Sequence, residues 1–425
     1  MIALEPQLVD RAAREAIRFG LDRTFLVEAA AGTGKTSELV GRVLQVILTG
    51  AGTLGSLAAL TFTEKAAGEL KLRLRTELDR ALGDLQLPEQ ARLRARRALS
   101  ELETANIGTI HGFCAEMLLR YPVEARIDPA FEVAEPERER ALLAEVFDSW
   151  LAGVLDDPPP GVRRVLARRA QSLAGKSPEQ QLLAAARQLI ETRDFGATYR
   201  RPAFERAAEL EALLDELQAL ASFQLQGSDN DPLCRTLKRL ACELEELPED
   251  LDAREALFRR LLRDRDLWSG QNGRGPLYAR GLPRSDVLAR REQVKARLDE
   301  VLRLCDAEVA ACLSEELRAV VERYASAKHE AGLLDFFDLL LCMRQLLANV
   351  PSVRLELQAA FSHVFVDEFQ DTDPVQSEIV LLLCADDPAQ SEPWRTRPVP
   401  GKLFLVGDPK QSIYRFRRAD ISTYA

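Results

Sequence analysis

Two adjacent carboxylates, Asp367 and Glu368, follow the apolar residues 364–366 in the sequence Val-Phe-Val-Asp-Glu-Phe-Gln-Asp-Thr-Asp. An apolar run that ends in acidic residues is typical of a buried parallel strand, which presents them at the carboxyl edge of a sheet, where nucleotides and metal ions bind. A buried strand followed by an ordinary acidic loop has the same pattern. Gln370 has no evident packing role in this acidic turn, and it suits coupling between a metal-bound phosphate and another group.

A second chemical pattern lies far upstream, in the sequence Phe-Leu-Val-Glu-Ala-Ala-Ala-Gly-Thr-Gly-Lys-Thr that ends at Thr36. Gly32 and Gly34 let the backbone curl so that its N–H groups point at phosphate oxygens, and the following helix N-terminus adds positive potential. Lys35 is suited to the β- and γ-phosphates, and the Thr36 hydroxyl to Mg²⁺. Ala29 occupies the first glycine position of the strict motif. A glycine-rich turn before an ordinary helix is the alternative interpretation.

The two patterns together predict a P-loop nucleoside triphosphatase. The predicted metal ligands are Thr36 and Asp367. The predicted nucleotide-binding residues are those of the loop and the helix start: Ala29, Ala30, Ala31, Gly32, Thr33, Gly34, Lys35, Thr36 and Ser37.

Composition narrows the class of protein. The 425 residues suffice for two or three domains, and a hydrophobic content of 46% excludes general disorder. The apolar runs are too short to cross a bilayer and the start lacks a signal core, so we expect no membrane association. Seven cysteines without a Cys-x-x-Cys pair, beside three histidines, favour a reducing cytoplasm and argue against a zinc or iron–sulfur site. The net charge of −10 argues against coating nucleic acid by bulk charge but permits a local basic groove.

Strand-like and helix-like segments alternate at both ends of the chain. We expect a helix within residues 1–20, a cap at Thr63 for the helix that follows it, and an amphipathic helix over residues 333–347. Strands alternating with helices predict an α/β fold with a parallel, doubly wound sheet. The predicted strands are residues 25–28, 57–62, 106–110, 363–367 and 403–406.

Between about residues 121 and 327 the pattern changes to long Arg-, Glu-, Leu- and Ala-rich stretches of helical periodicity, separated by Pro- and Gly-rich breaks. We interpret this region as a large all-helical domain inserted into the α/β domain. The predicted bounds are 1–122, 123–329 and 330–425. The alternative is that these helices pack directly on the sheet, although so long a segment would crowd it.

Four further segments contain Phe62, His111, Asp335 and Gln411, and each has a recognisable sequence. They read Leu-Thr-Phe-Thr-Glu-Lys-Ala-Ala, Gly-Thr-Ile-His-Gly-Phe-Cys, Leu-Leu-Asp-Phe-Phe-Asp and Val-Gly-Asp-Pro-Lys-Gln-Ser-Ile-Tyr-Arg-Phe-Arg. In this order, with the P-loop and Asp-Glu-Phe-Gln-Asp, they closely resemble the UvrD/RecB/AddA group of superfamily 1 DNA helicases. The resemblance covers both ends of the chain and is weak across the middle.

The resemblance implies a RecA-like domain of an ATP-dependent 3′–5′ DNA helicase that acts in DNA repair or recombination. It implies ATP and Mg²⁺ as cofactors and single-stranded DNA as partner, and it leaves room for a second helicase or nuclease subunit. Asp367 then holds the metal, and Glu368 is the general base that activates water for attack on the γ-phosphate. Gln411 resembles the γ-phosphate sensor, Gln370 its coupling partner, and Arg417 is expected near Glu368. With Lys35 these residues complete the predicted catalytic set.

The same resemblance implies a DNA-binding surface. The aromatic positions that match base-stacking residues are Phe62, Tyr414 and Phe416, and the positions that match phosphate contacts are Thr61, Thr63 and His111. A core position is the alternative interpretation for a lone phenylalanine, and a capped surface position is the alternative for the histidine.

Several positions depart from the group. The adenine-reading glutamine is expected near Arg11 or Ala13, but the upstream glutamine is Gln7, which leaves the preference for ATP open. Arg418 stands where the group has glycine, and adds a cation near the DNA path or a solvated charge. The motifs end with the Gln411 segment, so we expect the second RecA-like domain and its arginine fingers to be absent from this chain. A single domain is not expected to step along DNA.

The sequence is also compatible with two other functions. The chain could hold nucleotide and DNA without hydrolysis, as a binding fragment or split subunit without helicase activity on its own. It could instead be a P-loop switch that regulates a partner, in which case single-stranded DNA would not change its affinity for nucleotide.

Overall fold

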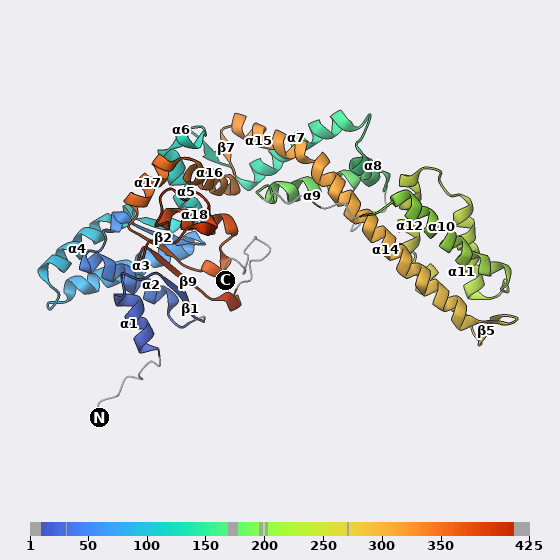
Figure 1. The fold of residues 1–425 in the computed structure, drawn as a ribbon, viewed down its shortest axis with the longest axis horizontal. Coiled ribbons are helices and arrows are strands. Elements are labelled where there is room, and N and C mark those ends of the chain that lie inside the picture. The colour runs from blue at the N-terminus through green and yellow to red at the C-terminus, as the bar shows by residue number, and fades with distance from the viewer. Residues whose placement is uncertain are drawn as a thin grey trace, which may run out of the picture. The chain divides into compact units, whose positions relative to one another are not determined.

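The computed structural model describes residues 10–30, 32–168, 177–194, 199, 203–269 and 272–411. The chain divides into two compact units, and Figure 1 shows the elements of each. The first, here called the sheet unit, comprises Met1–Glu135 with His329–Ala425. The second, here called the helical unit, comprises Pro136–Lys328.

A parallel sheet forms the centre of the sheet unit. In the described residues it has five strands in the order β1-β9-β8-β2-β3, and every neighbouring pair is parallel. The bounds are β1 Phe25–Glu28, β2 Leu57–Thr61, β3 Asn106–Thr109, β8 His363–Val366 and β9 Leu403–Gly407. The predicted α/β class with a parallel central sheet is therefore confirmed.

Helices cover both faces of this sheet because successive strand residues point to opposite sides. On β2, Leu57 and Ala59 pack with α2 (Lys35–Thr49), α3 (Glu64–Gly83) and α4 (Glu89–Glu101). Ala58 and Leu60 face the opposite cluster, which contains residues of α5 (Ile110–Arg120), α16 (Phe336–Asn349), α17 (Pro351–Ala360) and α18 (Pro374–Cys384). The inner strands β2 and β8 are thus buried from two sides, whereas the edge strands β1 and β3 keep some residues partly exposed.

The helix predicted over residues 333–347 begins later than its periodicity indicates. Leu333 and Leu334 form strand β7, which pairs in parallel with β4 (Glu132–Val133). Asp335 then caps α16: its carboxylate accepts the Asp338 N–H at 2.7 Å, and the Asp338 carboxylate accepts the Asp335 N–H at 3.0 Å. This reciprocal cap determines the residue at which the helix starts. The spacing of apolar residues in the sequence does not reveal such a cap. The predicted cap at Thr63 is confirmed, since its hydroxyl accepts the Ala66 N–H at 3.1 Å.

The helical unit consists mainly of helices around two apolar clusters. One cluster contains residues of the early helices with Val309 and Tyr324, and the other contains residues of the later helices with Val287 and Cys305. The 33-residue helix α14 contributes to both. The described helices are α7 Pro136–Val154, α8 Pro160–Ala167, α9 Pro178–Glu191, α10 Arg206–Ser222, α11 Pro232–Glu245, α12 Leu251–Arg263, α13 Arg265–Ser269, α14 Arg284–Glu316 and α15 Arg318–Glu330.

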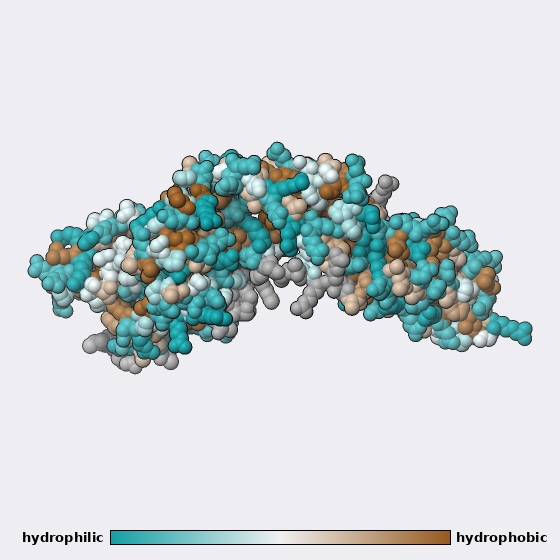
Figure 2. All heavy atoms as spheres, turned by 45° about the horizontal axis from the view of Figure 1, so that its top comes forward, coloured by the Kyte–Doolittle hydropathy of each residue, from teal (hydrophilic) through white to brown (hydrophobic). Residues whose placement is uncertain are grey.

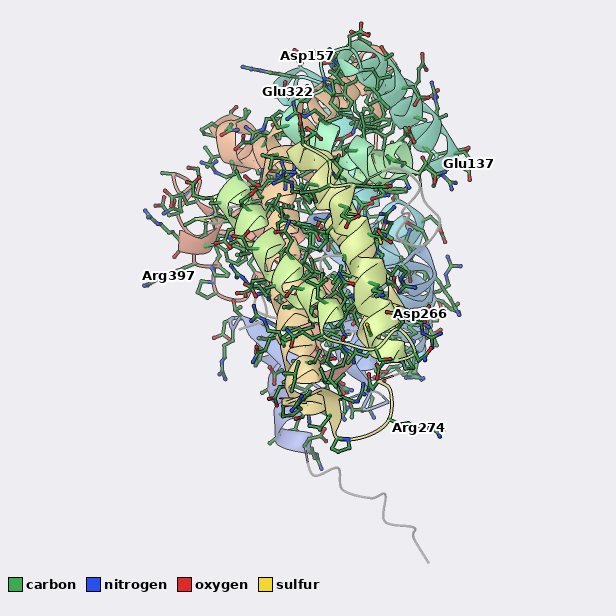
Figure 3. All side chains as sticks on the ribbon, turned by 90° about the vertical axis from the view of Figure 1, so that its right-hand side faces the viewer. Glu137, Asp157, Asp266, Arg274, Glu322 and Arg397 are labelled. Carbon is green, nitrogen blue, oxygen red and sulfur yellow. The ribbon has the colours of Figure 1, made fainter. Side chains whose placement is uncertain are left out.

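A short antiparallel pair in this unit, β5 (Leu277–Ala279) with β6 (Leu282–Pro283), has no counterpart in the predicted helical pattern. Its strands are too short to show an alternating pattern, and Gly281 turns the chain between them with a φ of +77°. Figure 3 shows Glu137 and Arg274 of this unit pointing outward, away from the helices.

The surface in Figure 2 is mainly hydrophilic, with hydrophobic side chains scattered over it in small groups. Within the described residues, no single helix combines the length and apolar composition needed to cross a bilayer. The bent pair α16–α17, with 103° between its halves, meets both criteria only when the two helices are taken together.

Candidate nucleotide and DNA site

The predicted site segments directly follow the strands of the main sheet. The P-loop follows β1, Asp367 follows β8, and Asp408 follows β9. The segments of Phe62 and His111 follow β2 and β3. Since all these strands are parallel, their carboxyl ends meet at one edge, where ligands bind in sheets of this kind.

The P-loop has the backbone that its glycines predict. Gly32 and Gly34 have φ of +76° and +92°, a region that other residues adopt at a cost. A Cβ atom at Gly32 would meet nothing within 4 Å, so conformation rather than space requires glycine there. Thr33 folds back on the loop, since its hydroxyl donates to the Ala30 carbonyl at 2.7 Å. Gly34 is then the N-cap of α2, and Lys35 is its first residue.

The acidic pair lies against the end of this loop. The Thr36 hydroxyl donates to Asp367 Oδ2 at 3.2 Å, and Lys35 Nζ lies 3.4 Å from Glu368 Oε2. These contacts join residues that are 331 and 333 positions apart in the chain. Lys35 and Asp367 are buried, whereas the Glu368 side chain keeps 37% of its surface exposed. Burial, and then the charge of Glu368, raise the pKa of Asp367.

Glu368 has a strained backbone. Its φ of 53° and ψ of 44° place it in the left-handed region, which costs about 1–2 kcal/mol for a residue with a Cβ atom. Its N–H donates to Asp367 Oδ1 at 3.0 Å, which helps to hold this turn. The turn directs the Glu368 carboxylate toward the Lys35 ammonium.

Gln370 joins two loops of the site. Its Nε2 donates to Glu368 Oε2 at 2.6 Å, and its Oε1 accepts the Asp408 N–H at 2.8 Å. The side chain is buried, with 4% of the residue exposed. Asp408 in turn accepts the Lys410 N–H at 3.1 Å, one residue before Gln411. The carboxylate after β8 is therefore connected through one amide to the loop after β9.

The predicted phosphate-contacting threonines differ in exposure. Thr61 is buried, and its hydroxyl donates to the Thr63 and Gly108 carbonyls at 3.1 and 3.4 Å. Thr63 is exposed and caps α3, and Phe62 between them is half-buried. The Thr61 hydroxyl therefore serves the local fold in this structure. Phe62 and Thr63 have more surface to offer to a ligand.

His111, near the start of α5, is half-buried, and burial lowers its pKa. Its ring meets Phe336 edge-on, with centroids 5.5 Å apart and planes at 89°. Phe336 is 52% exposed although it is a large aromatic residue. It belongs to the motif of Asp335, but the sequence predicted no role for it. Its place in that motif is the signal by which the sequence could have singled it out.

Some predicted site residues lie outside the described part of the chain. These are Ala31, Tyr414, Phe416 and Arg417. Gln7 and Arg418, which depart from the pattern of the helicase group, also lie outside it. Gln411 ends the short 3-10 turn Pro409–Gln411, and its side chain also lies outside that part.

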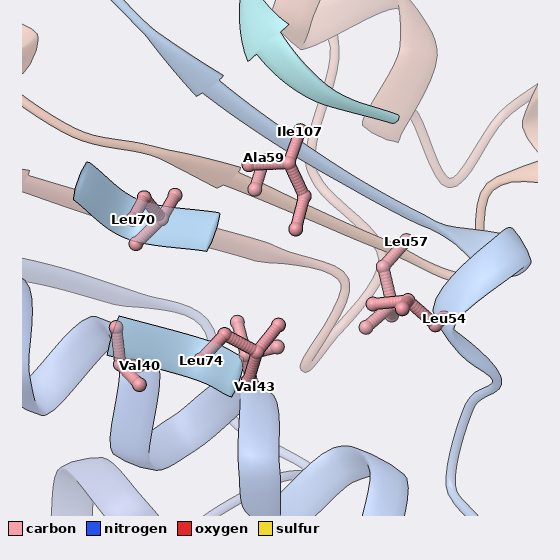
Figure 4. Close-up of a pocket in the computed structure, with 8 residues that line it drawn as sticks. All are labelled: Val40, Val43, Leu54, Leu57, Ala59, Leu70, Leu74 and Ile107. Atoms are coloured by element: carbon pink, nitrogen blue, oxygen red, sulfur yellow. The ribbon is translucent and has the colours of Figure 1, made fainter. Parts of the chain in front are cut away.

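A small cavity in the sheet unit is not a candidate site for nucleotide, metal or DNA. Figure 4 shows it in the core between α2, α3 and the sheet, and its lining is entirely apolar. The lining residues are Val40, Val43, Leu54, Leu57, Ala59, Leu70, Leu74 and Ile107. In the described residues no group of three or more His, Cys, Asp or Glu side chains is arranged to hold a metal ion.

Comparison with known proteins agrees with this arrangement. Residues 9–425 match the family model of the UvrD/REP helicase N-terminal domain. The A subunit of the ATP-dependent helicase/nuclease from Bacillus cereus strain ATCC 14579 is 30% identical over 466 residues, which cover 94% of this chain and 34% of that protein. The protein of the same name from Geobacillus kaustophilus strain HTA426 is 30% identical over 452 residues, covering 94% and 35%. That of Listeria welshimeri serovar 6b is 28% identical over 443 residues, covering 93% and 34%.

The chain thus spans about a third of the length of the curated relatives it matches. The family match extends over nearly the whole chain and includes every motif found at the carboxyl edge of the sheet. The chain belongs to the UvrD/REP helicase N-terminal domain family.

Proposed function

We propose that this chain is the ATP-hydrolysing, single-strand-binding portion of an ATP-dependent 3′–5′ DNA helicase of the UvrD/RecB type. The observation that supports the proposal most strongly is the contact between the P-loop and the acidic pair. Lys35 contacts Glu368 and Thr36 contacts Asp367, across more than 330 residues of chain. The similar proteins are named as parts of an ATP-dependent helicase/nuclease, which supports the use of ATP.

The side chains at this edge fit a nucleotide with Mg²⁺. The Thr36 hydroxyl and the Asp367 carboxylate are hard oxygen donors of the kind that Mg²⁺ prefers, and they already lie within 3.2 Å of each other. The Lys35 ammonium and the N-terminus of α2 supply positive charge for phosphates. When bound, Mg²⁺ would neutralise charge on the phosphates.

Hydrolysis requires a base that can accept a proton from water, and we assign that role to Glu368. Its carboxylate is partly exposed, and the left-handed turn together with the Gln370 amide holds it beside Lys35. We assign Gln370 the coupling role, because the same amide binds the Asp408 N–H, next to the Gln411 turn. A change at the Gln411 turn can thereby move the base. We propose Arg417 near Glu368 on the family resemblance alone.

The DNA contacts are proposed for the loops after β2 and β3. Phe62 and Thr63 follow β2, and His111 follows the neighbouring strand β3. The His111 ring contacts Phe336 of α16, which adds a partly exposed aromatic group. Aromatic side chains stack on bases of any sequence, as a translocating protein requires. We add Tyr414 and Phe416 to this surface, and Thr61 through its role in shaping the loop.

Several broader assignments are also proposals. We propose that the helical unit is an inserted domain, and that the longer protein contains a second RecA-like domain and works with a second subunit in DNA repair or recombination. The relatives are themselves named as one subunit of an enzyme, which supports a partner. No disulfide joins the cysteines, all of which lie in the described residues, and this supports our proposal of a reducing cytoplasm.

A nucleotide-binding and ATPase assay on the 425-residue chain tests the proposal. We expect Mg²⁺-dependent binding of fluorescent ADP that Lys35→Ala abolishes, and slow ATP hydrolysis that single-stranded DNA accelerates. Glu368→Gln should retain binding but reduce turnover by at least about a hundredfold, because it removes the general base.

Two outcomes would redirect the assignment. Nucleotide and DNA binding without any turnover would favour a binding fragment or split subunit. Nucleotide affinity that does not respond to single-stranded DNA would favour a regulatory P-loop switch.

A further inference from the structure

Arg14, on helix α1 (Arg11–Phe19), contacts the P-loop from outside the predicted site. Its Nη2 donates to the Thr33 carbonyl at 2.8 Å. A Cβ atom built on Gly34 would lie 3.5 Å from Arg14 Nη1, so the guanidinium lies against the turn that precedes α2. The P-loop is therefore held from α1 as well as by its own residues.

Carboxylates fix this guanidinium in place. Arg14 Nη1 lies 2.8 Å from Glu38 Oε1, and Nη2 lies 2.9 Å from Asp10 Oδ2. Glu38 is buried in the first turn of α2, with 4% of the residue exposed. Arg18 binds the same carboxylate from the next turn of α1, with its Nε 2.7 Å from Glu38 Oε2. Arg14 alone of these two arginines reaches the Thr33 carbonyl through a described bond.

The far end of α1 is anchored independently. Arg42 of α2 is fully buried and donates to the Ile17 carbonyl at 2.6 Å, the Gly20 carbonyl at 3.1 Å and the Arg23 carbonyl at 2.8 Å. These bonds fix the chain that leaves α1 to α2. Helix α1 is thereby fixed to α2, and this holds the backbone of Arg14 in place next to the P-loop.

The bond to Thr33 matters because a peptide group is planar. In a trans peptide the carbonyl and the following N–H point in opposite directions. With the Thr33 carbonyl held toward α1, the Gly34 N–H points away from α1. Glycine permits peptide rotations that other residues resist, so this peptide needs an external partner to stay in one orientation.

We propose that Arg14 is a positioning residue of the nucleotide site, which orients the Thr33–Gly34 peptide for phosphate. This inference rests on the proposed nucleotide-binding function. Arg14 acts on the loop and not on the base, and Glu38 holds it in position. Its effect is therefore expected on the phosphate part of any nucleotide.

The test measures the affinities of fluorescent ADP, GDP and CDP for the 425-residue chain and its variants. Arg14→Ala should weaken all three by a similar factor, about tenfold, since a charge-assisted hydrogen bond contributes on that order. Arg18→Ala is the matched control: it also removes a partner of Glu38, but it has no described bond to the loop. We expect it to change affinity by less than about twofold.

Further variants separate positioning from folding. Arg14→Gln can still donate to a carbonyl and should recover part of the affinity, and it replaces Arg14→Ala if the latter does not fold. Glu38→Gln should weaken binding less than Arg14→Ala, because Asp10 still pairs with Arg14. Thermal unfolding without nucleotide shows whether each variant folds, so that a loss of affinity in a folded variant is assigned to the loop and not to loss of the fold.

Three results would overturn the inference. A loss of affinity confined to ADP would make Arg14 a base-reading residue. An equal loss in Arg18→Ala would mean that Arg14 acts through packing. The third is an unchanged affinity in Arg14→Ala. Lys35→Ala distinguishes these from failure of the proposed function. If that variant binds nucleotide as well as the parent chain does, the P-loop is not the site.

Discussion

At the scale of single residues, two side chains each connect separate elements at the site. Gln370 binds the Glu368 carboxylate with one end of its amide and the Asp408 N–H with the other. A carboxylate in this position would not do both, because it has no donor for Glu368. An alanine would leave the strained turn at Glu368 without its lateral support. Arg14 is the second such residue, since it joins α1 to the P-loop.

Gln370→Ala is therefore expected to lower kcat for DNA-stimulated ATP hydrolysis by about tenfold to a hundredfold, since the general base loses its orientation. The affinity for ADP should change by less than about twofold, because the P-loop is untouched. The measurement is steady-state hydrolysis with a nucleotide titration. Gln358→Ala, which removes an amide bond to the Leu382 carbonyl in the same unit, is the control and should leave kcat unchanged. A loss of nucleotide affinity instead of kcat would contradict the coupling role.

Phe336 offers a second test at this scale. Phe336→Ala should weaken single-stranded DNA binding by about fivefold or more, equally for oligonucleotides of different sequence, since base stacking is tolerant of sequence. Fluorescence anisotropy with labelled oligonucleotides measures this. Trp394→Ala is a matched control, because Trp394 is an aromatic residue of similar exposure, 55% against 52%. Equal effects of the two variants would argue against a specific role for Phe336.

At the scale of elements, a buried carboxylate joins helices of the helical unit. Glu255 of α12 pairs with Arg164 of α8, Arg206 of α10 and Arg259 of its own helix, at 2.9, 2.8 and 2.9 Å. Burial by itself would raise the pKa of Glu255, but the three arginines outweigh it and lower the pKa to about 2. Arg164 also binds Glu308 of α14 at 2.7 Å, so the network reaches the long helix.

The sign of the pH dependence follows from that pKa. The pKa in the folded state lies below the ordinary 4.5, so the stabilisation is complete above pH 4.5 and is lost as the pH falls toward about 2. Glu255→Gln should cost about 3–5 kcal/mol at pH 7, since it leaves buried arginines without their counter-charge. At pH 3 the difference from the parent chain should be smaller by about 2 kcal/mol, because part of the stabilisation is already lost there.

Urea unfolding at the two pH values measures this difference. Glu211→Gln, which removes an ion pair of a carboxylate that is 62% exposed, is the control and should cost no more than about 1 kcal/mol at either pH. A Glu255→Gln cost that does not depend on pH would show that packing, not charge, is responsible.

At the scale of the whole molecule, the chain has separate apolar clusters in its two units. Calorimetry of the 425-residue chain should therefore resolve two unfolding transitions. ADP with Mg²⁺ at about 100 times its Kd should stabilise only the sheet unit, by about 2.7 kcal/mol. Glu255→Gln should lower only the other transition. A single transition that shifts as a whole with either change would contradict independent unfolding.

Local rules account for the features that the sequence predicted well. A glycine at positive φ, a threonine cap and an apolar strand run depend on a few neighbouring residues, so the P-loop, the Thr63 cap and the main strands could be read directly. The start of α16 and the short pair β5–β6 were missed, because a reciprocal cap and a two-residue strand leave no periodic pattern.

The sequence by itself determined which chemical groups this protein has, their order and the family to which it belongs. Only the tertiary structure decided which of them meet. Strand order brings β8 beside β9 and β9 beside β1, and this brings Gln370 to Asp408 and Lys35 to Glu368. The docking of α1 on α2 likewise places Arg14 on Thr33. The physical reason is that contacts between distant residues depend on how strands and helices pack, which no local pattern specifies.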